Sequence, residues 1–136
     1  MSTNSPAPRR FVVDTWAWLE YLQGSPAGRK VKEILDDPGN EIIANPIIVA
    51  ELWSQARRRG QDLAPVTEAI NAATVTPLDR TLGEAAGETH ARLRKRDPDF
   101  PLADAFVLET ARKSGAKVVT GDPHFRGEKD VVFIGR

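Results

Sequence analysis

Four acidic residues interrupt apolar segments of this 136-residue sequence, namely Asp14, Glu51, Asp104 and Asp122. Burying an isolated carboxylate is costly unless the group is paired, protonated or bound to a cation. The chain has 19 acidic residues and ample surface to hold all of them in water. We therefore predict that these four share one site. Carboxylates that converge without matching bases favour a hard divalent cation, because Mg²⁺ and Mn²⁺ prefer oxygen ligands.

Such a site suits the hydrolysis of phosphodiesters. Carboxylates around Mg²⁺ leave several water positions that phosphate oxygens can take. The cation stabilises developing charge and lowers the pKa of a bound water, and an acid outside the metal shell can orient that water as a general base. Each acid also has a structural explanation. Asp14 can cap a helix, Glu51 can lie at the surface or pair with an arginine, Asp104 suits a first helical turn, and Asp122 can begin an Asp-Pro turn.

Composition excludes several other classes. The sequence is 40% hydrophobic and 28% charged, as in soluble globular proteins. It has no cysteine, which excludes disulfides, thiolate zinc sites and cysteine nucleophiles. No apolar run approaches the roughly 20 residues of a membrane span, so we expect a cytoplasmic protein without membrane contact.

The formal net charge of zero excludes a global field for polyanions, so any contact with nucleic acid must be local. Basic residues do cluster, at Arg57–Arg59 and again between Arg92 and Arg96. Each cluster is either a nucleic-acid contact or a solvated helix end.

Short apolar strands alternate with helical segments along the chain. We predict strands over residues 11–13, 41–44, 74–76, 117–120 and 131–134. We predict helices over residues 15–23, 26–35, 46–60, 65–73, 79–96 and 101–114 from apolar spacing and from capping and stop signals. Residues 1–9, rich in Ser and Pro, are predicted to be a disordered arm, and residues 10–136 a single domain.

This alternation predicts an α/β fold with a mostly parallel sheet of four to five strands, covered on both faces. Ligands in such folds bind beyond the carboxyl ends of the strands, at a switch in strand order. Asp14 and Asp122 come directly after apolar strands, while Glu51 and Asp104 lie in early turns of helices that follow strands. We therefore expect all four acids at the same edge of the sheet.

The segments around these acids resemble those of a known family. In chain order they are VVDTWAWLEYL, IIVAELW, PLADAFVLETARKSGAKVV and TGDPHF, between Phe11 and Ile134. In order and spacing they resemble the PIN-domain ribonucleases, and among these the VapC-type toxins of toxin–antitoxin pairs. The resemblance implies a PIN-like three-layer α/β/α sandwich.

The resemblance also implies an activity, that of an endoribonuclease dependent on Mg²⁺ or Mn²⁺. It implies that the four acids bind the metal and that the hydroxyl of Thr120 supports the last acid or a water. The fourth acid varies most in the family, so Asp99 and Asp130 are possible substitutes for Asp122. His90 and His124 stand alone and lack the spacing of a zinc site.

The implied partners are an RNA substrate, a second copy of the chain in a homodimer, and a small antitoxin that neutralises the toxin. An antitoxin of this kind often wraps an apolar groove. Trp16, Trp18, Tyr21 and Leu22 are candidates for that groove, although ordinary core packing explains at least half of them.

Two other functions remain open at this stage. One is a PIN nuclease of RNA processing or decay that is not a toxin. The other is a receiver-like signalling module, which is also a parallel α/β domain with acids that bind Mg²⁺. Receivers place paired acids at the end of the first strand, whereas Asp14 stands alone there, and they need a lysine after a late strand, where this chain has Thr-Gly-Asp.

Overall fold

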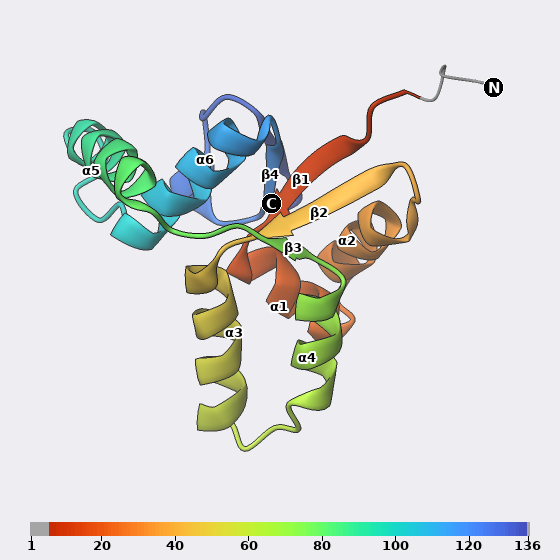
Figure 1. The fold of residues 1–136 in the computed structure, drawn as a ribbon. Coiled ribbons are helices and arrows are strands. Elements are labelled where there is room, and N and C mark those ends of the chain that lie inside the picture. The colour runs from red at the N-terminus through yellow and green to blue at the C-terminus, as the bar shows by residue number, and fades with distance from the viewer. Residues whose placement is uncertain (1–5, 136) are drawn as a thin grey trace.

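A five-stranded parallel sheet between two layers of helices forms the centre of the computed structural model, which describes residues 6–135 (Figure 1). The strands lie in the order β3-β2-β1-β4-β5, and every neighbouring pair is parallel. Their bounds are β1 (Arg9–Val13), β2 (Asn40–Ala44), β3 (Thr74–Val75), β4 (Lys117–Thr120) and β5 (Val131–Phe133). The predicted three-layer α/β/α fold with its mostly parallel sheet is confirmed.

The helices fill the connections between successive strands. Their bounds are α1 (Thr15–Gln23), α2 (Pro26–Asp36), α3 (Pro46–Arg58), α4 (Ala64–Asn71), α5 (Arg80–Leu93) and α6 (Leu102–Ser114), with a short 3₁₀ turn η1 (Pro123–Phe125). The path from β1 to β2 runs in one direction across the sheet and the path from β3 to β4 runs back. Right-handed crossovers therefore place α1 and α2 on one face and α6 on the other (Figure 1).

Local signals set most helix boundaries. Asp14 caps α1 by accepting the N–H of Ala17 at 2.9 Å, and Gly24 ends this helix in the left-handed conformation at φ 69°. Several helix boundaries differ from the prediction by one to three residues. The helix predicted over residues 79–96 ends at Leu93, and residues 94–96 form turns. The turn η1 was not predicted.

The first strand begins two residues earlier than its apolar pattern predicts. Arg9 extends β1 because its N–H donates to the carbonyl of Gly39 at 3.0 Å and its guanidinium donates to Asn40 at 2.9 Å and Asp37 at 2.7 Å. Of the arm predicted over residues 1–9, residues 1–5 lie outside the described residues and residues 6–8 have no regular secondary structure.

The core lies on both faces of the central strand β1 and its neighbours. Val12 and Val13 in β1 and Val118 and Val119 in β4 are buried, as expected for strands covered by helices on each side. The largest fully buried side chain is Trp18 on α1. Of the two explanations given for Trp18, a groove residue or core packing, the structure therefore supports core packing. None of the described helices is long and apolar enough to cross a membrane.

Candidate active site

The strand order switches between β1 and β4, because the chain adds β2 and β3 on one side of β1 and β4 and β5 on the other. Asp14 follows β1 directly, and its N–H donates to the carbonyl of Val119 in β4 at 3.2 Å. Asp122 comes two residues after β4. Two of the predicted acids therefore lie at the switch point, where ligands of open α/β sheets bind.

Asp14 is the most deeply buried of the four acids, with 4% of its surface exposed. Its pKa is raised from the ordinary value of 3.8 to about 7, mainly by burial and to a smaller extent by the negative charges of Asp122 and Glu51. Hydrogen bonds from the Thr120 side chain and the Ala17 N–H oppose this rise of the pKa. Asp14 is thus both a helix cap and a carboxyl group in an unfavourable environment for its charge.

Asp104 lies in the first turn of α6, on the other face of the sheet from α1. Burial raises its pKa from 3.8 to about 7, with further contributions from Asp122 and Asp14, while His124 lowers it. Its Oδ2 atom is buried and has no hydrogen-bond partner among the described residues. A buried carboxylate oxygen without a hydrogen-bond partner is energetically costly, which indicates that a bound ligand supplies the missing partner.

Asp122 is held by the turn that it begins. Its N–H donates to Oγ1 of the fully buried Thr120 at 3.0 Å, and its Oδ1 accepts the N–H of His124 at 2.9 Å. The Asp-Pro turn and the acidic cluster are therefore not alternatives, because the same side chain serves both. The resemblance implied a supporting hydroxyl at Thr120, and this hydroxyl lies between Asp14 and Asp122.

Glu51 differs from the expectation that all four acids lie in core-like surroundings, because it is exposed. Ile48, Leu52 and Ala56 form the buried stripe of α3 at a spacing of four, and Glu51 lies beside that stripe. It still faces the cluster, because the hydroxyl of Thr15 donates to its Oε1 at 2.6 Å.

The two helices that carry Glu51 and Asp104 are joined by a buried hydrogen bond. Asn45 caps α3 by accepting the N–H of Ile48 at 2.9 Å. Its amide donates to Oγ1 of Thr110 on α6 at 3.0 Å, and both side chains are almost completely buried. This contact fixes α3 relative to α6.

The four carboxylates interact with one another and lack basic partners. Asp14, Glu51 and Asp122 all act on Asp104 as like charges. Within residues 6–135 none of the four forms an ion pair with Lys or Arg. The result is a concentrated negative charge in partly buried surroundings, which a cation would relieve.

The donor atoms fit a hard divalent cation, since all are carboxylate oxygens and one is buried without a partner. In the described part of the chain, no group of three or more Asp, Glu or His side chains has the spacing to hold one metal ion. Mg²⁺ is commonly bound through one or two carboxylates, with waters in its other positions. Asp14 and Asp104, the two acids with raised pKa values, are the best candidates for such direct ligands.

The other residues considered from the sequence lie in different places. Asp130 directly precedes β5 and therefore lies at the amino ends of the strands, away from the cluster. Asp99 is exposed, and its charge is not among the main causes of the raised pKa values of Asp14 and Asp104. His90 contacts the carbonyl of Phe100 at 3.0 Å, between α5 and the loop before α6.

Sequence reasoning missed one ion pair beside the cluster. Nδ1 of His124 lies 2.7 Å from Oδ2 of Asp97, which raises the pKa of His124 above its ordinary value and lowers that of Asp97. The negative charges of Asp122 and Asp104 also raise the pKa of His124. The two partners are 27 residues apart. The nearness of His124 to Asp122 in the sequence was the available signal.

Comparison with known proteins supports the same family as the motifs. The PIN domain family matches residues 11–127. No curated protein sequence matches the chain. The solved structures similar to it include Mycobacterium tuberculosis VapC20, described as a sarcin–ricin loop cleaving toxin, with 22% identity and a TM-score of 0.69 over 89% of this chain and 96% of that one.

Two complexes have a similar fold. A toxin–antitoxin complex from Klebsiella pneumoniae has 19% identity and a TM-score of 0.69, over 90% of this chain and 96% of that one. VapBC2 from Rickettsia felis, bound to a DNA fragment from its promoter, has 16% identity and a TM-score of 0.70, over 91% and 96%. The motif order, the shared fold and the family match over most of the sequence lead to one conclusion: the chain belongs to the PIN-domain family of nucleases.

Proposed function

We propose that this protein is an endoribonuclease dependent on Mg²⁺ or Mn²⁺ and the toxin of a toxin–antitoxin pair. The observation that carries the proposal is the acidic cluster at the switch point, with two carboxyl pKa values raised to about 7 and an unpartnered buried oxygen on Asp104. Acids in such positions are expected where a cation and a phosphate group are to be bound.

In this proposal Asp14 and Asp104 hold the cation directly. The bound cation would supply charge stabilisation and activation of water. Glu51 or Asp122 serves as the general base that accepts a proton from the attacking water. Thr15 fixes Glu51 by its hydrogen bond, and Thr120 fixes the backbone at Asp122.

A cavity of about 530 Å³ beside Glu51 supports a nucleic-acid strand as substrate. Thr15, Ser54 and Arg58 line it together with Glu51. The guanidinium of Arg58, which donates to Ser54 at 3.2 Å, would contact a phosphate there. This assigns one member of the basic cluster at Arg57–Arg59 to the substrate.

The similarity to toxin–antitoxin complexes supports an antitoxin as partner. A second cavity, of about 250 Å³, lies between α1, α3 and α4, and its lining combines apolar side chains such as Leu22, Leu52 and Val66 with polar ones such as Gln55 and Arg59. It fits an apolar segment of such a partner. A cytoplasmic location and a homodimer belong to the same proposal, and size-exclusion chromatography with light scattering tests the dimer.

Cleavage of a labelled single-stranded or hairpin RNA by the purified protein tests the enzymatic part. We expect cleavage with Mg²⁺ or Mn²⁺, none with EDTA, and a loss of at least 100-fold in kcat/KM for Asp104→Asn, because a direct metal ligand is removed. Asp99→Asn is the matched control, since it removes an exposed carboxylate from the loop that leads into α6. Equal cleavage by parent and Asp104→Asn would refute the site.

The toxin role needs a separate experiment. Induced expression of the parent protein in bacteria should arrest growth, and expression of Asp104→Asn should not. Co-expression of a small protein encoded beside this gene should restore growth. Cleavage in vitro without growth arrest would instead favour a PIN nuclease of RNA processing or decay. The receiver-like hypothesis has no support, because the chain matches the PIN domain family.

A further inference from the structure

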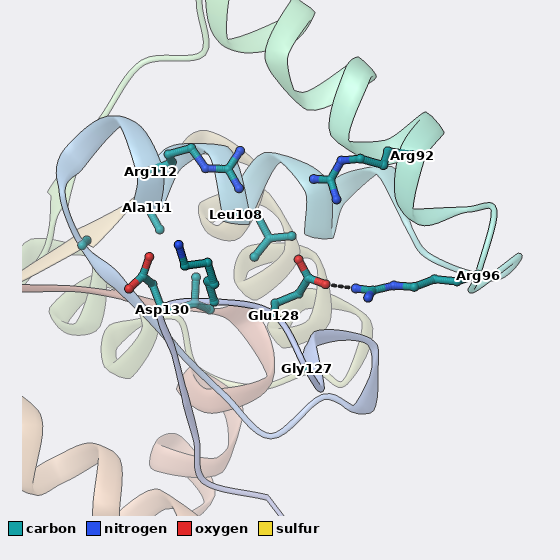
Figure 2. A pocket seen from close by; sticks show the side chains of 11 residues that line it. Arg92, Arg96, Leu108, Ala111, Arg112, Gly127, Glu128 and Asp130 are labelled. Atoms are coloured by element: carbon teal, nitrogen blue, oxygen red, sulfur yellow. Dashed lines mark ion pairs between the residues drawn. The ribbon is translucent and has the colours of Figure 1, made fainter.

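A cavity of about 480 Å³ lies between α6 and the segment that leads into β5 (Figure 2). Side chains from the end of α5, from α6 and from residues 127–130 line it. Cavities of this size accommodate small ligands or parts of larger ones. None of the four acids of the candidate active site lines it.

Cationic side chains dominate the polar lining. The lining contains four basic residues and only two acidic ones, Glu128 and Asp130. The basic residues are Arg92, Arg96, Arg112 and Lys129. Arg96 pairs with Glu128, and Arg112 pairs with Glu109 outside the cavity. Arg92 and Lys129 form no ion pair within residues 6–135.

The arrangement of the arginines favours an anion. In Figure 2 the guanidinium groups of Arg92 and Arg112 point toward one another. Two cations that converge from different helices repel each other unless a negative group lies between them. Guanidinium groups are suited to phosphate because their donors match its oxygens. The aliphatic part of the lining, which includes Leu108 and Val118, adds an apolar surface beside the charges.

The cavity lies toward the amino ends of β4 and β5, and two elements that form its walls also carry acids of the candidate active site. One wall is α6, which carries Asp104 in its first turn and Arg112 eight residues later, roughly 12 Å along the helix axis. The other wall is the segment that leaves Asp122 at the carboxyl end of β4 and returns to the amino end of β5. These two elements therefore connect the acids at one edge of the sheet with the arginines toward the other edge.

We propose that this cavity is a nucleotide-binding subsite for the RNA strand outside the cleavage site. A phosphate of the strand binds Arg92, Arg112 and Lys129, and its nucleoside packs on the aliphatic lining. The choice of RNA rests on the function proposed above. The acids at the cleavage site repel the backbone when no cation is bound, so anchoring by cations elsewhere gives the strand its affinity.

Fluorescence anisotropy of a labelled single-stranded RNA in EDTA measures this binding without cleavage. The test variant is Arg92→Ala/Lys129→Ala, which leaves both ion pairs intact. The control variant is Arg94→Ala/Lys95→Ala, which removes the same charge from exposed residues next to Arg92 that do not line the cavity. Circular dichroism verifies that both variants are folded.

We expect the test variant to bind RNA about tenfold more weakly and the control to bind like the parent. The slope of log K against log salt should fall by roughly 0.7 in the test variant, because the contact with one phosphate of a single strand is lost. In cleavage assays the test variant should show a raised KM and an unchanged kcat, since the subsite binds substrate and transition state equally.

Equal weakening in the test and control variants, or no binding by the parent in EDTA, would overturn the subsite. An effect of the test variant on antitoxin binding but not on RNA binding would overturn it as well. These outcomes are separate from the proposed function. If the protein binds RNA through the cavity but never cleaves it, the proposed subsite stands and the proposed nuclease activity is refuted. If both variants cleave RNA with the same KM, the proposed nuclease activity stands and the proposed subsite is refuted.

Discussion

The indole ring of Trp16 lies directly against the backbone of Gly121. A Cβ atom at residue 121 would lie far inside the van der Waals contact distance of Cη2 of Trp16. Trp16 lies in the first turn of α1, and Gly121 is the middle residue of the Thr-Gly-Asp step after β4. This contact fixes the position of Asp122 relative to Asp14, because each acid adjoins one of the two partners within two residues.

Gly121→Ala is therefore expected to lower the free energy of unfolding by about 1–3 kcal/mol through overpacking and to reduce cleavage by displacing Asp122. Urea unfolding measures the first effect. Gly87→Ala is the control, since a Cβ at this position on α5 meets nothing within 4 Å and should stabilise the helix slightly. The double variant Gly121→Ala/Trp16→Leu should regain stability, and its failure to do so would show that the clash is not the cause.

The raised pKa values of Asp14 and Asp104 predict that stability falls with rising pH when no cation is bound. Each carboxyl titrates near 3.8 in the unfolded chain and near 7 in the folded one. Between these values the folded state binds more protons, so each group lowers the free energy of unfolding by on the order of 1 kcal/mol per pH unit. Thermal unfolding in EDTA should show a lower Tm at pH 8 than at pH 5.

Mg²⁺ or Mn²⁺ at pH 8 should restore the Tm, because binding to the folded state alone stabilises it. In EDTA at pH 8, Asp104→Asn should be more stable than the parent, since a buried charge is removed, and should gain less from metal. Asp99→Asn should behave like the parent. A parent Tm that does not respond to metal would contradict a metal site at these acids.

Local patterns were sufficient to predict the sheet and the strand-end acids. Asp14 and Asp122 could be placed because each comes right after a short apolar strand, and a parallel sheet brings such ends to one edge. The exposure of Glu51 could also have been predicted. Its neighbours Ile48 and Leu52 define the buried stripe of α3 at a spacing of four, which leaves Glu51 beside it.

Contacts between distant segments could not be predicted in the same way. The hydrogen bond from Thr15 to Glu51 joins residues 36 apart, and its existence depends on how α1 packs on α3. The extension of β1 to Arg9 depends on side-chain bonds to a turn that the apolar pattern does not include. Both are tertiary effects that override local propensity.

Asn45 offers a test of how α3 is held. Asn45→Ala should lower the free energy of unfolding by about 1–3 kcal/mol, because it removes a helix cap and leaves the buried Thr110 hydroxyl without its partner. Cleavage should fall as well, since α3 carries Glu51. Ser25→Ala is the control. It removes the cap of α2, which carries none of the four acids, and should cost stability while cleavage is retained.

The ion pair between His124 and Asp97 predicts a second contribution to pH dependence. Asp97 raises the pKa of His124 above 6.5, so this pair stabilises the fold fully below pH 6.5 and is lost as the pH rises through the folded value. Asp97→Asn should lower the pKa of His124 measured by NMR titration of its ring, and Asp99→Asn should leave it unchanged.

This pair ties the loop before α6 to the turn after β4, so it also acts on the distance between Asp104 and Asp122. The ring of Phe100 in the same loop packs edge-on against His124, with centroids 5.9 Å apart. If the pair holds the loop before α6 against the turn after β4, Asp97→Asn should lower kcat/KM for RNA more at a pH below the raised pKa of His124 than at a pH above it, where the ring is neutral in the parent too. An equal loss at both pH values would mean that Asp97 acts without the charge of His124.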